Sequence, residues 1–155
     1  MKDKKPINLS WLVEKWTLVD EDSYLKNMWL NTESLDFVRI NKEIQSVEEI
    51  EANYIDIDSD VENYVLMPTE DELCEQDLRS AFLSKLSRQT RDNFVDNYEG
   101  ISPREEFMDK VYELGLDKEW NEFQKQAIAG LLLNWAMDEE IPINKDMEII
   151  NINKL

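Results

Sequence analysis

The stretch from Asp56 to Glu62 has the spacing closest to a metal-binding loop in this chain. Carboxylates stand at its first, third, fifth and seventh positions, as in a calcium loop: Asp56, Asp58, Asp60 and Glu62. Such a loop also needs glycine at its sixth position and a bidentate glutamate at its twelfth, where this chain has Val61 and Met67. The pattern therefore favours a strand end followed by a polar turn, with the four carboxylates as weak candidates for metal ligands.

Catalysis by paired carboxylates would draw on three acidic runs: Glu48-Glu49-Glu51, Glu70-Asp71-Glu72 and Asp138-Glu139-Glu140. The sequence contains no histidine, which removes the usual acid or base near neutral pH, the usual zinc ligand and every Ser-His or Cys-His pair. Its glycines stand far apart, so there is no glycine-rich phosphate loop. We predict no catalytic residue and no cofactor. A carboxylate-dependent or metal-dependent hydrolase that uses Asp56 to Glu62 is the enzymatic alternative.

The charge balance restricts the partners of the chain. It contains 17 Lys and Arg residues against 35 Asp and Glu residues, a net charge of -18. A field of this sign repels nucleic acids and anionic membranes, and the sequence shows no dense basic patch, so we expect direct binding to neither. The partner is expected to be another protein, with a basic surface as the natural match for this charge. Two alternatives are an acidic mimic of nucleic acid, and a charge that only keeps the protein soluble.

Cysteine content and hydropathy indicate the compartment. Cys74 is the single cysteine, so no internal disulfide can form, and we expect it to be a small buried apolar residue. The opening MKDKKPIN has no apolar signal region behind its lysines. No apolar run approaches the roughly 18 to 20 residues that span a bilayer. These features predict a cytoplasmic protein.

The first part of the chain, residues 1–67, has signals for both helices and strands. Apolar residues at helical spacing predict a short helix from Leu9 to Trp16. The runs SYLKNMWL and LDFVRI, on either side of a polar link at 31–34, predict a β-hairpin. A second short helix is expected over Asn41 to Ala52, with Ser46 and Glu49 as a capping box. Two further strands, at 54–57 and 64–67, would extend the sheet.

The second part, residues 68–143, is expected to be helical. Its helices are predicted to start at a capping box of Thr69 and Glu72, near Gln89 with an end at Gly100, and at Pro103 with an end at Gly115. Asp117 to Glu140 carries a wide apolar face and is expected to run through the middle of the domain. Gly130 within it indicates the close approach of another backbone, or of a ligand. The tail, 144–155, would add an edge strand or stay mobile.

These elements predict a single domain of the α+β class, in which an N-terminal helix and a small antiparallel sheet pack on a mainly helical C-terminal half. Five tryptophans are many for 155 residues. Trp16 and Trp135 are expected in the core. Trp29 and Trp120 are flanked by polar residues, so they are candidates for partly exposed anchors for a partner, although core placement is the favoured alternative for each tryptophan.

Several segments in a fixed order resemble a bacterial family known as uncharacterised protein family number one hundred and fifty-eight. They are YIDIDSDVENYVLMP, EGISPREEFMDKVYELGLDKEWNEF and AGLLLNWAMDEEI, which lie between residues 54 and 143. The family has a doubly basic stretch before the phenylalanine of the second segment, where this chain keeps only Arg104 and Lys110. The resemblance implies no established activity. The candidate interaction residues are Trp29, Arg104, Lys110, Trp120 and Phe123, in a non-enzymatic module.

Overall fold

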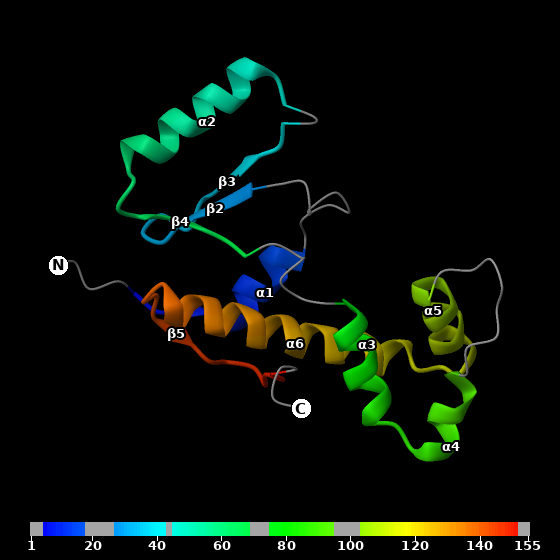
Figure 1. Ribbon diagram of the computed structural model, residues 1–155. Helices are drawn as coiled ribbons and strands as arrows, with labels where there is room; N and C mark the ends of the chain where they lie inside the picture. Colours follow the sequence, from blue (N-terminus) through cyan, green and yellow to red (C-terminus); the bar gives the residue numbers. More distant parts are fainter. Residues whose placement is uncertain (1–4, 18–26, 43–44, 69–74, 95–102, 152–155) are drawn as a thin grey trace.

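The computed structural model describes residues 5–17, 27–42, 45–68, 75–94 and 103–151. The fold is α+β, as predicted (Figure 1). Its elements in chain order are β1 (Ile7–Asn8), α1 (Leu9–Thr17), β2 (Asn27–Asn31), β3 (Phe37–Ile40), α2 (Val47–Ser59), β4 (Tyr64–Leu66), α3 (Glu75–Ser84), α4 (Arg88–Arg91), the 3-10 turn η3 (Asp92–Phe94), α5 (Pro103–Glu113), α6 (Asp117–Asp138) and β5 (Ile143–Asn144). The capping box at Thr69, Cys74 and Gly100 lie outside the described residues.

Helix α6 is the central element, because its two halves belong to two hydrophobic clusters. Its second half packs with α1 and the inner face of the sheet in the sheet-side cluster, whose members include Leu9, Leu12, Leu30, Ile128 and Leu132. Its first half packs with α3 and α5 in the aromatic cluster, whose members include Leu78, Phe82, Phe107, Val111, Trp120 and Phe123. The prediction that this helix runs through the middle of the domain is confirmed (Figure 1).

The antiparallel sheet has the strand order β3-β2-β4. The hairpin between β2 and β3 is confirmed, and β4 joins the free side of β2. Leu30 pairs with Phe37 on one side and Val65 on the other, and all three belong to or pack on the sheet-side cluster. Because side chains alternate between the two faces of a strand, the neighbouring residues must point away from this core.

The prediction of a strand over residues 54–57 is wrong, because these residues belong to α2. Ser46 caps this helix: its Oγ accepts a hydrogen bond from the backbone N–H of Glu49 at 3.2 Å, as the predicted capping box requires. Once started there, the helix continues beyond Ala52 to Ser59, since Tyr54 and Ile57 extend the helical spacing of its apolar residues. The apparent alternation of residues 54–57 is therefore part of a helical stripe.

The C-terminal segment from Ile143 to Asn151 crosses from the sheet-side cluster to the aromatic cluster. β5 pairs in parallel with β1, so the edge strand that was one alternative for the tail is present, but it includes only Asn144 of the tail. The backbone N–H of Ile150 then donates to the carbonyl of Gln126 at 2.9 Å. The Ile150 carbonyl lies so close to Gly130 that a Cβ there would overlap it. Gly130 thus meets another backbone, which was one of its two predicted roles.

Asp146 joins this segment to the start of α1. Its carboxylate accepts a hydrogen bond from the backbone N–H of Ser10 at 2.8 Å, and its other oxygen accepts one from the Ser10 hydroxyl. These hydrogen bonds favour the ionised form, so the side-chain bond to Ser10 first and its backbone bond second hold the pKa of Asp146 below its ordinary value of 3.8. Asp146 therefore acts as a cap for α1 supplied from far along the chain.

Candidate functional site

The outer face of the sheet carries a row of apolar side chains across all three strands. Trp29 of β2 pairs with Val38 of β3 and with Leu66 of β4, so the three side chains lie side by side. Trp29 and Val38 are half-buried, and Leu66 is 43% exposed. The structure thus agrees with the predicted partial exposure of Trp29 and adds two neighbours that extend its contact area.

Side chains cap the backbone at both edges of this sheet. The Leu66 carbonyl, on the outer edge of β4, accepts a hydrogen bond from the indole Nε1 of Trp135 at 2.9 Å. On the outer edge of β3, the Arg39 carbonyl accepts hydrogen bonds from Gln45 Nε2 and Asn53 Nδ2, both at 3.0 Å. These caps occupy acceptors that an added strand would use. A partner that binds this face would therefore contact its side chains and would not add a strand to the sheet.

Helix α2 packs against β3, where Asn53 binds the edge carbonyl of Arg39, and it leaves much of its own apolar surface uncovered. Val47, Ile50, Tyr54, Ile57 and Val61 follow the alternating three- and four-residue spacing of a helix-packing seam. Only Ile57 is buried within the helix, whereas Val47 is 70% exposed and Tyr54 is 40% exposed. Large exposed apolar side chains that gather in one region are typical of interaction sites.

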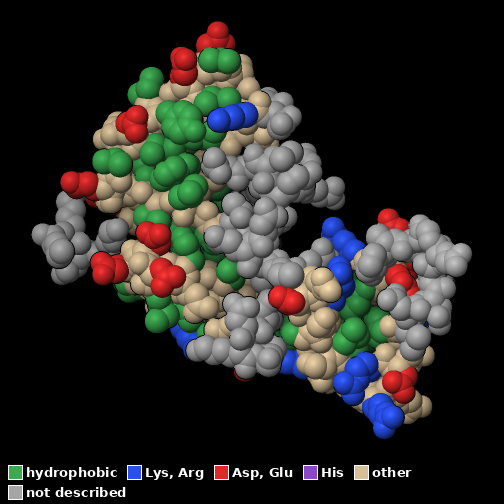
Figure 2. Space-filling view, viewed as in Figure 1, with side chains coloured by type: hydrophobic (Ala, Val, Ile, Leu, Met, Phe, Trp, Pro, Cys, Tyr) green, Lys and Arg blue, Asp and Glu red, His purple; other side chains and the backbone are tan. Residues whose placement is uncertain are grey.

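Acidic side chains predominate around this apolar region, although Arg39 of β3 and Lys42 just after it are exposed cations nearby. No Lys or Arg occurs between Lys42 and Arg79, and the described part of that stretch contains Glu48, Glu49, Glu51, Asp56, Asp58, Asp60 and Glu62. Figure 2 shows apolar side chains running down the α2 and sheet region, with several carboxylates along its border and a Lys or Arg group near its upper end. We call the region formed by Val38, Trp29, Leu66, α2 and these carboxylates the α2–sheet surface.

The candidate metal ligands do not converge. Asp56 and Asp58 lie two positions apart on α2, so they point to different sides of the helix. Asp60 holds a turn: its two oxygens accept hydrogen bonds from the side-chain amides of Asn31 and Asn63, each at 2.8 Å. Among the residues that the structure describes, no group of three Asp, Glu, Cys or His side chains could hold a metal ion.

Two predicted interaction residues are core residues. Trp120 is 2% exposed and Phe123 is 5% exposed, so the prediction that Trp120 is a partly exposed anchor is wrong. The Trp120 ring lies with its centroid 4.8 Å from that of Phe107 and 5.2 Å from that of Phe82, both edge to face. The polar neighbours of Trp120 in sequence lie on the exposed side of α6, and the helix turns the indole inward.

The two predicted basic residues lie on α5, on the helical side of the molecule away from α2 (Figure 1). Arg104 is exposed, and the Nζ of Lys110 forms an ion pair with Glu113 at 3.1 Å. The structure therefore does not bring Arg104 and Lys110 together with Trp29. No single site unites the five predicted interaction residues.

A second charged region, which is basic, was not predicted from the sequence. Between Asp77 and Asp92 the charged residues are all basic: Arg79, Lys85, Arg88 and Arg91. Figure 2 shows Lys and Arg side chains gathered on the part of the molecule that contains α3 and α4. The expectation that the chain lacks a dense basic patch is therefore wrong, and a local charge count would have revealed this one.

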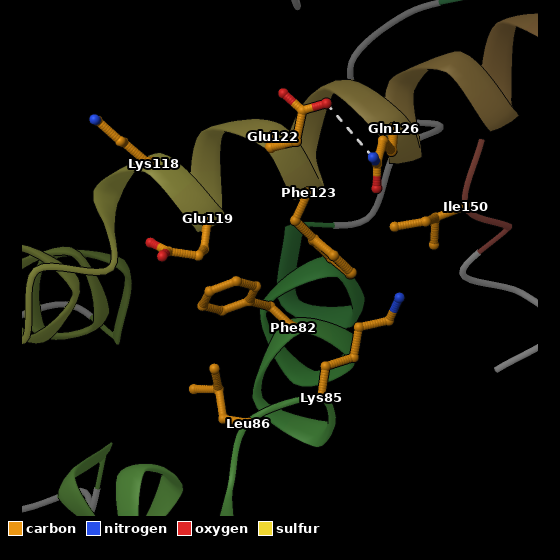
Figure 3. A pocket seen from close by; sticks show the side chains of 9 residues that line it. All are labelled: Phe82, Lys85, Leu86, Lys118, Glu119, Glu122, Phe123, Gln126 and Ile150. Carbon is orange, nitrogen blue, oxygen red and sulfur yellow. Dashed lines mark hydrogen bonds between the residues drawn. The ribbon is translucent and has the colours of Figure 1, made fainter. Parts of the chain in front are cut away.

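An open hollow of about 490 Å³ adjoins this basic region (Figure 3). Its apolar lining comes from Phe82, Leu86, Phe123 and Ile150. The ammonium of Lys85 lies 5.2 Å from the centroid of the Phe123 ring, a cation–π distance. The hollow thus combines an aromatic floor with a cation at its edge.

Comparison with models of known protein families, with curated proteins and with solved structures finds no match. The resemblance to the uncharacterised bacterial family stays a prediction. Among the described helices, none is both long and apolar enough to cross a membrane.

Proposed function

We propose that this protein is a non-enzymatic interaction module that binds a basic, amphipathic segment of a partner protein on its α2–sheet surface. The observation that carries the proposal is the row of Val38, Trp29 and Leu66 beside a helix with no cation. An apolar row can bury the apolar face of such a segment, and the surrounding carboxylates can attract its Lys and Arg residues.

A test of this function uses a fluorescently labelled helical peptide of Leu and Lys residues, with the leucines on one face. Fluorescence anisotropy then measures its dissociation constant. We expect binding that weakens as salt rises, since exposed charges attract less when screened. Trp29→Ala should weaken binding by about tenfold or more, because a central interface tryptophan carries a large share of the binding energy.

The matched control for Trp29→Ala is Tyr112→Ala, which removes an exposed aromatic side chain from α5. A second pair of variants isolates charge. Glu51→Lys with Asp58→Lys changes α2, and Asp77→Lys with Asp109→Lys makes the same change in net charge on α3 and α5. Only the α2 pair should reduce binding strongly. Equal effects of both pairs would reduce the proposal to a general attraction between an acidic protein and a basic peptide.

Mimicry of nucleic acid is a second candidate, favoured by the long stretch without Lys or Arg. In this case the partner would be a protein that normally binds nucleic acid, and its contact would depend on carboxylates. The two candidates differ in the role of Trp29. A partner whose binding withstands Trp29→Ala but is displaced by duplex DNA would favour mimicry over the amphipathic segment.

A further inference from the structure

The basic region on α3 and α4 differs in sign from the rest of the chain. Lys85, Arg88 and Arg91 are exposed, and each is three residues from the next. The net charge of -18 would repel an acidic partner at long range, so these cations can attract one only at close range. A site that works in this way needs a second, short-range source of affinity.

The hollow next to these cations can supply that affinity. Phe82 and Phe123 form its floor, Leu86 lies at one side and Ile150 at another (Figure 3). Its volume of about 490 Å³ lies within the range of ligand-binding clefts. The wall at Ile150 is fixed in place, because its backbone N–H is bonded to the Gln126 carbonyl. An apolar side chain can therefore enter a cavity that already exists.

The polar residues around the hollow limit where a negative charge can bind. Lys85 and Glu119 lie at different sides of the Phe82 ring, and Lys118 and Glu122 point outward from α6 (Figure 3). Glu119 and Glu122 disfavour a ligand with charge along its whole length over the hollow. A carboxylate is favoured on the side of Lys85.

From these observations we propose a second docking site, which takes an acidic peptide segment of another protein with one apolar or aromatic anchor side chain. The anchor would occupy the hollow over Phe82 and Phe123. A carboxylate next to the anchor would pair with Lys85, and one farther along the segment would pair with Arg88 on α4. This site does not depend on the proposed function of the α2–sheet surface, and the two would bind segments of opposite charge.

The probe for this site is a labelled peptide of Asp and Glu residues with one central Phe. Anisotropy should show saturable binding to the wild-type protein, and replacement of the peptide Phe by Ala should weaken it by about tenfold, as expected for loss of an anchor. Lys85→Glu with Arg88→Glu should weaken it by at least about tenfold. Lys85→Gln, which removes the charge without reversing it, should have an intermediate effect.

The matched control is Lys125→Glu with Lys145→Glu, which makes the same change in net charge at exposed positions that do not line the hollow. It should weaken binding by less than about threefold, since screening limits distant charges. The proposal fails if the wild-type protein does not bind the peptide, if both double variants weaken it equally, or if an oligonucleotide displaces it. Binding of the Leu and Lys peptide should not be weakened by Lys85→Glu with Arg88→Glu, so either site can fail while the other stands.

Discussion

Trp120 packs among the rings of Phe82, Phe107 and Phe123, whereas Trp29 lies half-buried on the outer face of the sheet. Around Trp120, helices α3, α5 and α6 supply apolar side chains from three sides. Around Trp29, the neighbours across the sheet are Val38 and Leu66, and Leu66 itself is exposed. The same residue type is thus placed in a closed cluster in one region and on an open face in the other.

The difference shows how each region is stabilised. Aromatic pairs in the closed cluster each contribute about 0.5–1.5 kcal/mol beyond the burial of their area. Helix α2 fully buries only Ile57, while Val47 and Ile55 are 70% and 67% exposed. A partner that covered this area would gain the hydrophobic energy that folding leaves unused, about 25 cal/mol per Å².

The largest expected effect compares the two tryptophans directly. Trp120→Ala should lower the free energy of unfolding by about 3–5 kcal/mol, because it opens a cavity in a closed cluster. Trp29→Ala should lower it by about 1 kcal/mol or less. Urea denaturation of both variants measures the difference. Similar losses would mean that the sheet face is as well packed as the aromatic cluster.

A smaller effect is expected at the place where the C-terminal segment crosses α6. Gly130→Ala should gain about 1 kcal/mol of helix propensity. The new Cβ would overlap the carbonyl of Ile150, however, and moving that backbone should cost about 1–3 kcal/mol. We therefore expect net destabilisation by thermal or urea denaturation. Asn134→Ala, at an exposed position of the same helix, should be slightly stabilising, and a similar gain in Gly130→Ala would refute the close approach.

The ends of α5 and α6 offer a third comparison, because each has a residue with positive φ. Gly115 has φ 68° at the end of α5, and Glu140 has φ 57° at the end of α6. Glycine adopts this conformation without the steric cost that a side chain brings. Glu140→Gly should therefore stabilise by about 1 kcal/mol, and Gly115→Ala should destabilise by about the same amount. Equilibrium denaturation that gave the same sign for both would contradict this account.

The smallest effect concerns the contact between Asp146 and Ser10. Because the folded-state pKa of Asp146 is lowered, its ionised form stabilises the fold above pH 3.8, and this contribution is lost as pH falls through the folded pKa. Asp146→Asn should lower the Tm at neutral pH. The difference in Tm between the wild type and the variant should shrink below pH 3.8. A difference that stayed constant into strong acid would exclude a role for the charge.

Helical periodicity in the sequence was enough to predict α1, α5 and α6, and the hairpin followed from two apolar runs around a polar link. It failed at Tyr54 to Ile57, where alternating residues fit a strand as well as part of a helical stripe. The capping box at Ser46 was recognised, and it marks the start of α2. The extension of this helix beyond Ala52 follows instead from the continuous apolar stripe that ends near Val61. Local sequence patterns therefore predict the start of that helix better than its end.

The candidate site was only partly predictable, because exposure depends on contacts between distant segments. Trp29 and Trp120 both have polar neighbours in sequence, and only the strand pairing of one and the helix packing of the other separate them. The basic stretch from Arg79 to Arg91 was visible in the sequence, although the hollow beside it needs α3, α6 and Ile150 in place. The metal candidates failed because α2 separates Asp56 from Asp58, while Asp60 binds two asparagines.

The most direct test of the central claim follows the tryptophan indole N–H signals by NMR while the Leu and Lys peptide is added. If the α2–sheet surface is the docking site, the signal of Trp29 should shift progressively and saturate with the bound fraction. The signal of Trp120, which is buried on the helical side of the molecule, should stay in place. A shift of Trp120 with an unchanged Trp29 signal, or no shift of Trp29 at saturating peptide, would contradict the account.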